Sequence, residues 1–286
     1  GMQVQVDTRD NITVYTGSQF GSYSRIDKTK PFMGRVSVRP AHELGEKPLR
    51  FNWQSPILLS KHNQDVFYFG SNRFHRSFSK GENSANLSAD LTGGKKEGNV
   101  PFGTLVTMSE SPLRFGLIYT GSDDGFIHVT KDGGYTWAAV HTKLPKNVQG
   151  LYISRVIASK FKEGRVYATL NGYRNDQFNA YVFVSEDYGT SWKQICLDLP
   201  VEPVNVIKED PKAENVLYIG TDHGLYVSVD GGASTMAWAG SLPRVAVHDI
   251  AIQERENEIV LGTHGRSIYI GSLNEVQKLG TDKAYY

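Results

Sequence analysis

Six short apolar runs that end in Tyr-x-Gly or a close variant recur along the chain at intervals of about 42 to 53 residues. They cover residues 14–17, 67–70, 118–121, 166–169, 217–220 and 259–262. Each follows another short apolar run and precedes a polar turn and a further β-rich run. Such runs, bounded by Gly, Asp and Ser, are typical of strands. No window shows a capped helical period, so the pattern predicts an all-β chain.

A second repeat, S/T-x-D-x-G-x-x-W, follows the third β-rich run in several of these repeating segments. It reads T-K-D-G-G-Y-T-W at 130–137, S-E-D-Y-G-T-S-W at 185–192 and S-V-D-G-G-A-S at 228–234, with a weaker copy, S-F-S-K-G-E-N-S, at 77–84. The Asp can accept backbone N–H bonds across a tight turn, the Gly supplies left-handed backbone, and the Trp packs on the hairpin root. We interpret five of these residues as structural: Asp132, Trp137, Asp187, Trp192 and Asp230.

Each repeating segment is therefore expected to hold four antiparallel strands, A to D, with the motif turn joining C to D. Repeated sheets of this kind close radially into a β-propeller, which protects their edges. We predict one propeller domain over 1–286, with blades that start near 3, 54, 104, 152, 203 and 246. Six blades are favoured; seven blades, or part of a larger propeller, are the alternatives. Two segments interrupt the regular spacing of these strands: 28–50 is expected to be a long connection, and 92–100 a polar loop. The tail at 274–286 is expected to supply a last outer strand.

Composition narrows the classes of function. The 31 basic and 30 acidic residues give a net charge of +1, which favours neither nucleic acid nor an anionic membrane as partner. Cys196 is the single cysteine, so it forms no internal disulfide. No apolar run reaches the roughly 20 residues of a membrane span. We expect an exported protein, extracellular or periplasmic, whose leader is not in this sequence; a cytoplasmic location is the alternative.

The motif turns resemble the BNR, or Asp-box, repeats of sialidases, sortilin-type receptors and two-propeller endoglucanases acting on xyloglucan. Further stretches resemble a group of bacterial BNR-repeat propellers described as glycosyl hydrolase-like or sortilin-like. These are R-F-N-W-Q-S-P at 50–56, S-A-D-L-T at 88–92, P-V-N-V-I at 203–207, V-H-D at 247–249 and G-T-H-G-R-S-I at 262–268. The resemblance, over about 50–272, implies a carbohydrate or protein ligand and an additional propeller in a longer chain.

The turns between strands B and C share one face of a propeller, where a pocket is expected. They carry three carboxylates, Asp123, Asp124 and Asp222. Two carboxylates that face each other can hydrolyse a glycosidic bond, one as acid and the other as base or nucleophile. Asp123 or Asp124 with Asp222 is the best catalytic pair in the sequence. The alternative is that these residues stabilise their turns through side-chain bonds to the backbone.

Seven further residues of these turns are candidates for ligand binding: Arg73, Tyr173, Arg174, Asp176, His223, His264 and Arg266. The longest turn, N-G-Y-R-N-D-Q-F-N at 171–179, combines aromatic rings with charge, which suits stacking on a sugar or anchoring a protein. A solvated loop tip and structural histidines are the alternatives. We expect no cofactor and no metal, since no H-x-H or C-x-x-C spacing is present.

Two functions from different classes remain. We expect a carbohydrate- or protein-binding module, with a xyloglucanase-like glycoside hydrolase as the alternative. A sortilin-like receptor would lack its companion cysteine-rich domain here. Sialidase activity is disfavoured, because resemblance to that family would require an R-I-P motif near the first blade and three arginines that bind the substrate carboxylate. The chain has no R-I-P motif, and the arginines of its first blade, Arg9 and Arg25, lie in a different sequence context.

Overall fold

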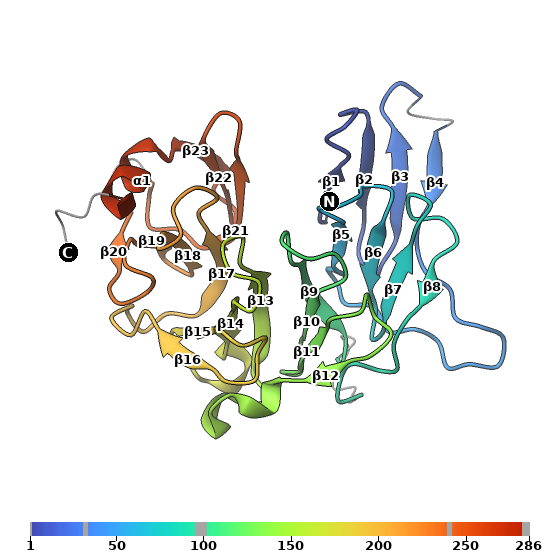
Figure 1. The fold of residues 1–286 in the computed structure, drawn as a ribbon, viewed down its shortest axis with the longest axis horizontal. Coiled ribbons are helices and arrows are strands. Elements are labelled where there is room, and N and C mark those ends of the chain that lie inside the picture. Colours follow the sequence, from blue (N-terminus) through green and yellow to red (C-terminus); the bar gives the residue numbers. More distant parts are fainter. Residues whose placement is uncertain (1, 31–33, 95–101, 239–241, 282–286) are drawn as a thin grey trace. The chain divides into compact units, whose positions relative to one another are not determined.

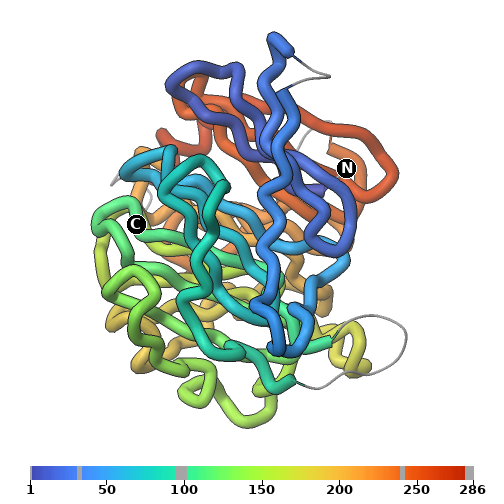
Figure 2. Tube along the Cα trace, turned by 90° about the vertical axis from the view of Figure 1, so that its right-hand side faces the viewer, coloured from blue at the N-terminus to red at the C-terminus, as the bar shows by residue number. Residues whose placement is uncertain are grey.

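The computed structural model describes residues 2–30, 34–94, 102–238 and 242–281. The chain forms two compact units, 1–142 and 143–286, each with three antiparallel sheets (Figure 1). Within each sheet consecutive strands are hydrogen-bonded neighbours, so the chain runs up and down (Figure 2). These sheets are the blades of the predicted six-bladed β-propeller, and the fold class is confirmed.

Unit 1 holds the first three blades. Its strands are β1 (Gln5–Val6), β2 (Thr13–Gly17), β3 (Tyr23–Asp27), β4 (Arg35–Ser37), β5 (Ile57–Leu59), β6 (Phe67–Gly70), β7 (Phe74–Ser77), β8 (Ala85–Asn86), β9 (Leu105–Glu110), β10 (Ile118–Ser122), β11 (Ile127–Thr130) and β12 (Ala138–Ala139). Tyr15, Phe67 and Phe69 pack in one buried cluster, and Phe74 and Leu105 pack in another. The apolar residues of the Tyr-x-Gly runs thus face the cores between successive sheets.

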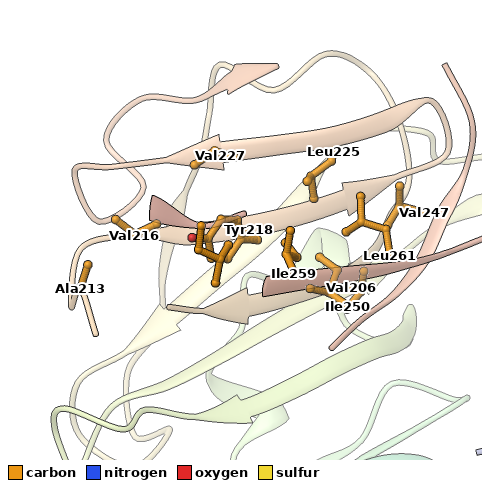
Figure 3. Packing of buried hydrophobic residues seen from close by; sticks show 11 residues of the cluster. Val206, Ala213, Val216, Tyr218, Leu225, Val227, Val247, Ile250, Ile259 and Leu261 are labelled. Atoms are coloured by element: carbon orange, nitrogen blue, oxygen red, sulfur yellow. The ribbon is translucent and has the colours of Figure 1, made fainter. Parts of the chain in front are cut away.

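Unit 2 holds the other three blades and a helix. Its elements are β13 (Tyr152–Ala158), β14 (Val166–Asn171), β15 (Tyr181–Ser185), β16 (Lys193–Ile195), β17 (Val204–Glu209), β18 (Leu217–Thr221), β19 (Gly224–Ser228), β20 (Met236–Ala237), β21 (Val247–Gln253), β22 (Glu258–Thr263), β23 (Ile268–Ser272) and α1 (Asn274–Thr281). Short 3-10 turns span His141–Lys143, Lys146–Val148 and Tyr173–Asn175. Figure 3 shows the apolar cluster between its last two sheets, where Leu225 lies among Val247, Ile250 and Leu261.

Two local expectations were wrong. The segment 28–50, predicted as a connection, contains β4, whose short run Arg-Val-Ser carries too few apolar residues to register as a strand. The tail, predicted as an outer strand, forms α1 instead. Val276 packs against the last core cluster, and the Gln277 side chain donates to both carboxylate oxygens of Asp210 at 3.1 and 2.9 Å, which fixes the helix on the preceding blade. Residues 95–100 of the second interruption and 282–286 of the tail lie outside the described residues.

The three motif turns have one shared hydrogen-bond pattern. In the first, Thr130 Oγ1 donates to Asp132 Oδ1 at 2.8 Å, and Asp132 accepts from Thr136 N at 2.9 Å and Thr136 Oγ1 at 2.6 Å. Gly134 N donates to Thr130 Oγ1 at 2.9 Å and adopts a φ of 107°, which favours glycine. Asp187 and Asp230 make the corresponding bonds in their own turns.

The tryptophan of the motif joins its turn to the neighbouring blade. Trp137 Nε1 lies 3.0 Å from the carbonyl oxygens of both Gly134 and Leu87, and its ring contacts Phe74 at 5.2 Å between centroids. Trp192 is half-buried just before β16. In this geometry the motif closes the outer hairpin of a blade.

Candidate functional site

The two catalytic candidates in unit 1 are buried turn residues. Asp123 Oδ1 accepts from the backbone N of Gly103 and of Thr104, both at 2.8 Å, and its Oδ2 accepts from Thr104 Oγ1 at 2.7 Å and Asn52 Nδ2 at 3.2 Å. Burial raises the pKa of Asp123, although the bonds from Thr104 oppose that rise. With four donors on its two oxygens, this carboxylate ties three segments of the unit together.

Asp124 is held in a similar way. Its Oδ1 accepts from Ser122 Oγ at 2.6 Å and its Oδ2 accepts from Gly93 N at 2.8 Å, and the residue is only 8% exposed. Arg73, also in unit 1, is half-buried and reaches Glu46 at 3.3 Å. Each of these two Asp residues therefore ties its B–C turn to another segment of the unit, Asp123 to residues 103–104 and Asp124 to Gly93.

Unit 2 carries the third carboxylate in a hydrogen-bonded chain. Asn171, at the end of β14, accepts from the backbone N of Tyr173 and donates through Nδ2 to Asn205 Oδ1, both at 3.0 Å. Asn205 Nδ2 in turn donates to Asp222 Oδ1 at 2.9 Å. Asp222 is half-buried in the turn between β18 and β19. The B–C turns of two neighbouring blades are therefore coupled through amide side chains.

A β-bulge places Asn205, and the same feature recurs in every blade of unit 2. The pairing between strands A and B shifts by one residue between Ile153 and Arg155, between Val204 and Val206, and between Val247 and Asp249. The extra residues are Ser154, Asn205 and His248, all polar. Bulges redirect side chains and are frequent next to active sites. The three bulges lie where strand A pairs with the end of strand B, beside the B–C turns.

The third bulge adds two histidines and an ion pair. The ring centroids of His248 and His264 lie 5.4 Å apart, and Arg155 Nη2 donates to Asp249 Oδ1 at 2.8 Å. Partial burial lowers the pKa of His248, with a further lowering from His264, while the charge of Asp222 acts in the opposite direction. Asp249 thereby links the innermost strands of the first and last blades of this unit.

We name these residues the bulge cluster; its members are Ser154, Arg155, Asn171, Asn205, Asp222, His248, Asp249 and His264.

An aromatic loop borders the bulge cluster. Tyr173 and Phe178 are 63% and 44% exposed, and their rings make an edge contact at 5.8 Å between centroids. Arg174 Cζ lies 5.4 Å from the ring centroid of Tyr152. Because the backbone N of Tyr173 donates to Asn171 Oδ1, the loop that carries the exposed rings is hydrogen-bonded to the chain of amide side chains.

The remaining predicted residues lie at the edge of this region. Asp176 is exposed at a φ of 55° in the same loop, and Arg266 is exposed in the turn after β22. His223 is exposed and its Nδ1 lies 3.6 Å from Glu202 Oε1, while Thr221 Oγ1 donates to Glu202 Oε2 at 2.7 Å. Within the described part of the chain, no group of three or more His, Cys, Asp or Glu is arranged to hold a metal ion, and no helix is long and apolar enough to cross a membrane.

Sequence reasoning did not single out Arg155, Asn171, Asn205, His248 or Asp249 as site residues. A signal was present, because each bulge interrupts an apolar A strand with a polar residue, as in V-N-V-I and V-H-D-I. The prediction concentrated on turns and did not consider that a bulge would bring an interior strand position to the same face.

Comparison with solved structures supports the β-propeller. The chain is similar to the GH74 xyloglucanase from Xanthomonas campestris, with a TM-score of 0.66 and 19% identity over 93% of this chain and 44% of that one. An ancestral GH74 enzyme matches with a TM-score of 0.58 and 17% identity over 75% and 28%. YCF48 bound to a D1 peptide matches with a TM-score of 0.62 and 13% identity over 95% and 77%.

At these identities the likeness shows the fold alone. The chain spans less than half the length of the two GH74 enzymes. No protein-family model and no curated protein matches the sequence.

Proposed function

We propose that the protein is a β-propeller binding module of the BNR-repeat type whose bulge cluster and Tyr173–Phe178 loop bind a carbohydrate. The observation that carries the proposal is the continuous chain from Tyr173 through Asn171 and Asn205 to Asp222. Sugars present many hydroxyl groups above flat apolar ring faces. Neutral amides and a carboxylate can bond the hydroxyl groups, while an exposed aromatic ring packs on the sugar face.

Preorganisation supports this assignment. Asn205 is 9% exposed and uses both ends of its amide within the protein, so its orientation is fixed before a ligand arrives. Side chains that need not be ordered on binding lose less entropy. The two GH74 neighbours also support a carbohydrate ligand, since the first is named as a xyloglucanase and the second as an enzyme of the same GH74 group. YCF48 is named as bound to a peptide, so a peptide ligand is the alternative if the screen below retains no glycan.

The test is a screen of purified protein against plant and bacterial glycans, followed by calorimetry on the glycans retained. Tyr173→Ala is expected to weaken binding about 5- to 10-fold, since one stacked aromatic contributes about 1 kcal/mol. Tyr135→Ala is the matched control, because Tyr135 is 73% exposed in a motif turn of unit 1. Equal affinities of the two variants, or retention of no glycan at all, would overturn the proposal.

A glycoside hydrolase activity is the second candidate. Asp222 favours it, because this half-buried carboxylate is positioned by Asn205 and lies close enough to His248 to influence the pKa of that histidine. Asp123 and Asp124 are weaker candidates, since hydrogen bonds occupy both oxygens of each. If the chain hydrolyses xyloglucan, Asp222→Asn should lower product release at least 100-fold; unchanged release would remove Asp222 as a catalyst.

A further inference from the structure

The last blade of unit 2 has a free strand edge. The other five sheets each contain four strands, whereas β21, β22 and β23 form a sheet of three (Figure 1). Within the described ranges no strand pairs with the outer edge of β23, because the chain continues into α1. Strand edges carry unpaired N–H and C=O groups that can pair with another chain.

The complete blades define what is missing at this edge. In four of them the residue directly after strand D donates its N–H to a backbone carbonyl of strand C, and the acceptor residue occupies the same position in each blade. These bonds are Val38 N to Tyr23 O at 3.1 Å, Leu87 N to Phe74 O and Val140 N to Ile127 O at 2.9 Å, and Trp238 N to Leu225 O at 2.8 Å. Each acceptor pairs with the Gly of the Tyr-x-Gly run. In the last blade Ile268 pairs with Gly262 and holds this position.

The residues that donate these bonds all have apolar side chains. Val38, Leu87 and Trp238 are apolar, and each packs in the same cluster as its acceptor, Tyr23, Phe74 or Leu225 respectively. The acceptors are buried, with exposures of 1%, 0% and 2%. Ile268 at the same position is 66% exposed, and Ile270, two residues on, is 65% exposed. Among the residues that the structure describes, the outer edge of the last blade thus has neither a backbone partner nor an apolar cover.

Strand β23 has no feature that protects an edge. Its sequence, I-Y-I-G-S, contains no charge and no proline. Since alternate residues direct their backbone groups to opposite edges, Ile268 and Ile270 point theirs outward, as Leu225 and Val227 do in the preceding blade. Natural edge strands usually carry lysine, proline or a bulge to prevent pairing.

We propose that the outer edge of β23 binds an extended segment of a partner polypeptide, which adds antiparallel as the fourth strand of this blade. The segment would run for at least three residues and carry Val, Leu or Trp where its N–H meets the Ile268 carbonyl. Main-chain bonds would supply the affinity, and the apolar side chain on Ile268 the specificity. β23 begins directly after the last B–C turn, but its outer backbone edge belongs to none of the residues of the bulge cluster, so the proposal does not depend on carbohydrate binding.

The test uses the peptide G-Y-T-W-A-A-V-H, residues 134–141 of this chain, because it contains a complete fourth strand and its apolar donor. The control peptide replaces Ala139 by Pro and Val140 by Asp. Hydrogen exchange of the full chain is followed at millimolar peptide. We expect exchange at Ile268–Ser272 to slow at least tenfold with the first peptide and not with the control.

Two variants locate the effect. Ile270→Pro removes an N–H that faces outward, so it should block strand addition without breaking the β22–β23 ladder; Ile270→Val is its matched control. Should Ile270→Pro lower the melting temperature, Ile268→Lys replaces it, since this exposed side chain can change without loss of the fold. Slowing that persists in these variants, or no slowing in the wild type, would refute the proposal. A concentration-dependent dimer abolished by Ile270→Pro would assign the edge to a second copy and overturn the partner strand.

Discussion

Removing the carboxylate of one motif turn should destabilise the protein by a predictable amount. Asp230 accepts hydrogen bonds from Ser228 Oγ at 2.8 Å, Ser234 N at 2.9 Å and Ser234 Oγ at 2.6 Å. A hydrogen bond to a charged group contributes roughly 1.5–3 kcal/mol when it is buried. Because Asp230 is half-buried and Ser234 is exposed, we reduce this to about 1 kcal/mol for each bond. Asp230→Ala should therefore cost about 2–3 kcal/mol.

The loss is measured by urea and thermal unfolding, and we expect the melting temperature to fall by about 4–8 °C. Asp230→Asn keeps one acceptor and should lose about half as much. Glu275→Ala, at a side chain that is 83% exposed, is a surface control and should stay within about 0.5 kcal/mol.

The pH dependence gives a second check on the same residue. Burial alone would raise the pKa of Asp230, but the bonds from Ser234 and Ser228 outweigh it and lower the pKa. The charged form is therefore favoured by folding, and its stabilisation is present above about pH 4 and lost as the pH falls below that. The difference between wild type and Asp230→Ala should shrink towards pH 3. A constant difference, or one below about 0.5 kcal/mol at pH 7, would refute this explanation of the motif.

Three further predictions use other residues. Gly134→Ala should cost about 2–4 kcal/mol in unfolding measurements, since φ is 107° there and the new Cβ would lie 3.1 Å from Leu87 and Phe74; a neutral effect would contradict the turn geometry. Burial lowers the pKa of His75 to about 4, so unfolded chains bind the proton first and the unfolding free energy should fall by up to about 3 kcal/mol from pH 7 to pH 4. The unfolding free energy of a His75→Gln variant should fall less over that pH range, and an equal fall would contradict the assignment of this pH dependence to His75. Burial raises the pKa of Cys196 to about 12, so a thiol reagent should label it only after denaturation; rapid labelling of the native protein would contradict its burial.

Periodicity in the sequence predicted the blades because each one repeats the same physical requirements. The first strands begin at Gln5, Ile57, Leu105, Tyr152, Val204 and Val247, close to the expected starts. Tyr-x-Gly runs gave the second strand of each blade, and the motif turns gave the outer hairpin. Where the motif was absent, the outer strand was missed, as at β4 in the first blade.

The candidate site was less predictable, because spacing along the chain does not show what a side chain bonds. Asp123 lies in a B–C turn as expected, yet its oxygens face Gly103, Thr104 and Asn52, which no turn pattern indicates. Asn205 depends on a bulge, which follows from pairing between two strands. The tail became a helix because Gln277 and Val276 find partners on the neighbouring blade, a tertiary effect that local composition did not contain.

The most direct test of the proposed binding site is a hydrogen-exchange footprint of the glycan that the protein retains in the screen. We predict slower exchange at 171–181, 204–206 and 247–249 on addition of the glycan, with the footprint lost in Asn205→Ala at matched concentrations. A footprint that lies instead on the motif turns of unit 1, around Phe78 and Tyr135, or one that is unchanged in Asn205→Ala, would contradict the assignment of the bulge cluster as the ligand site.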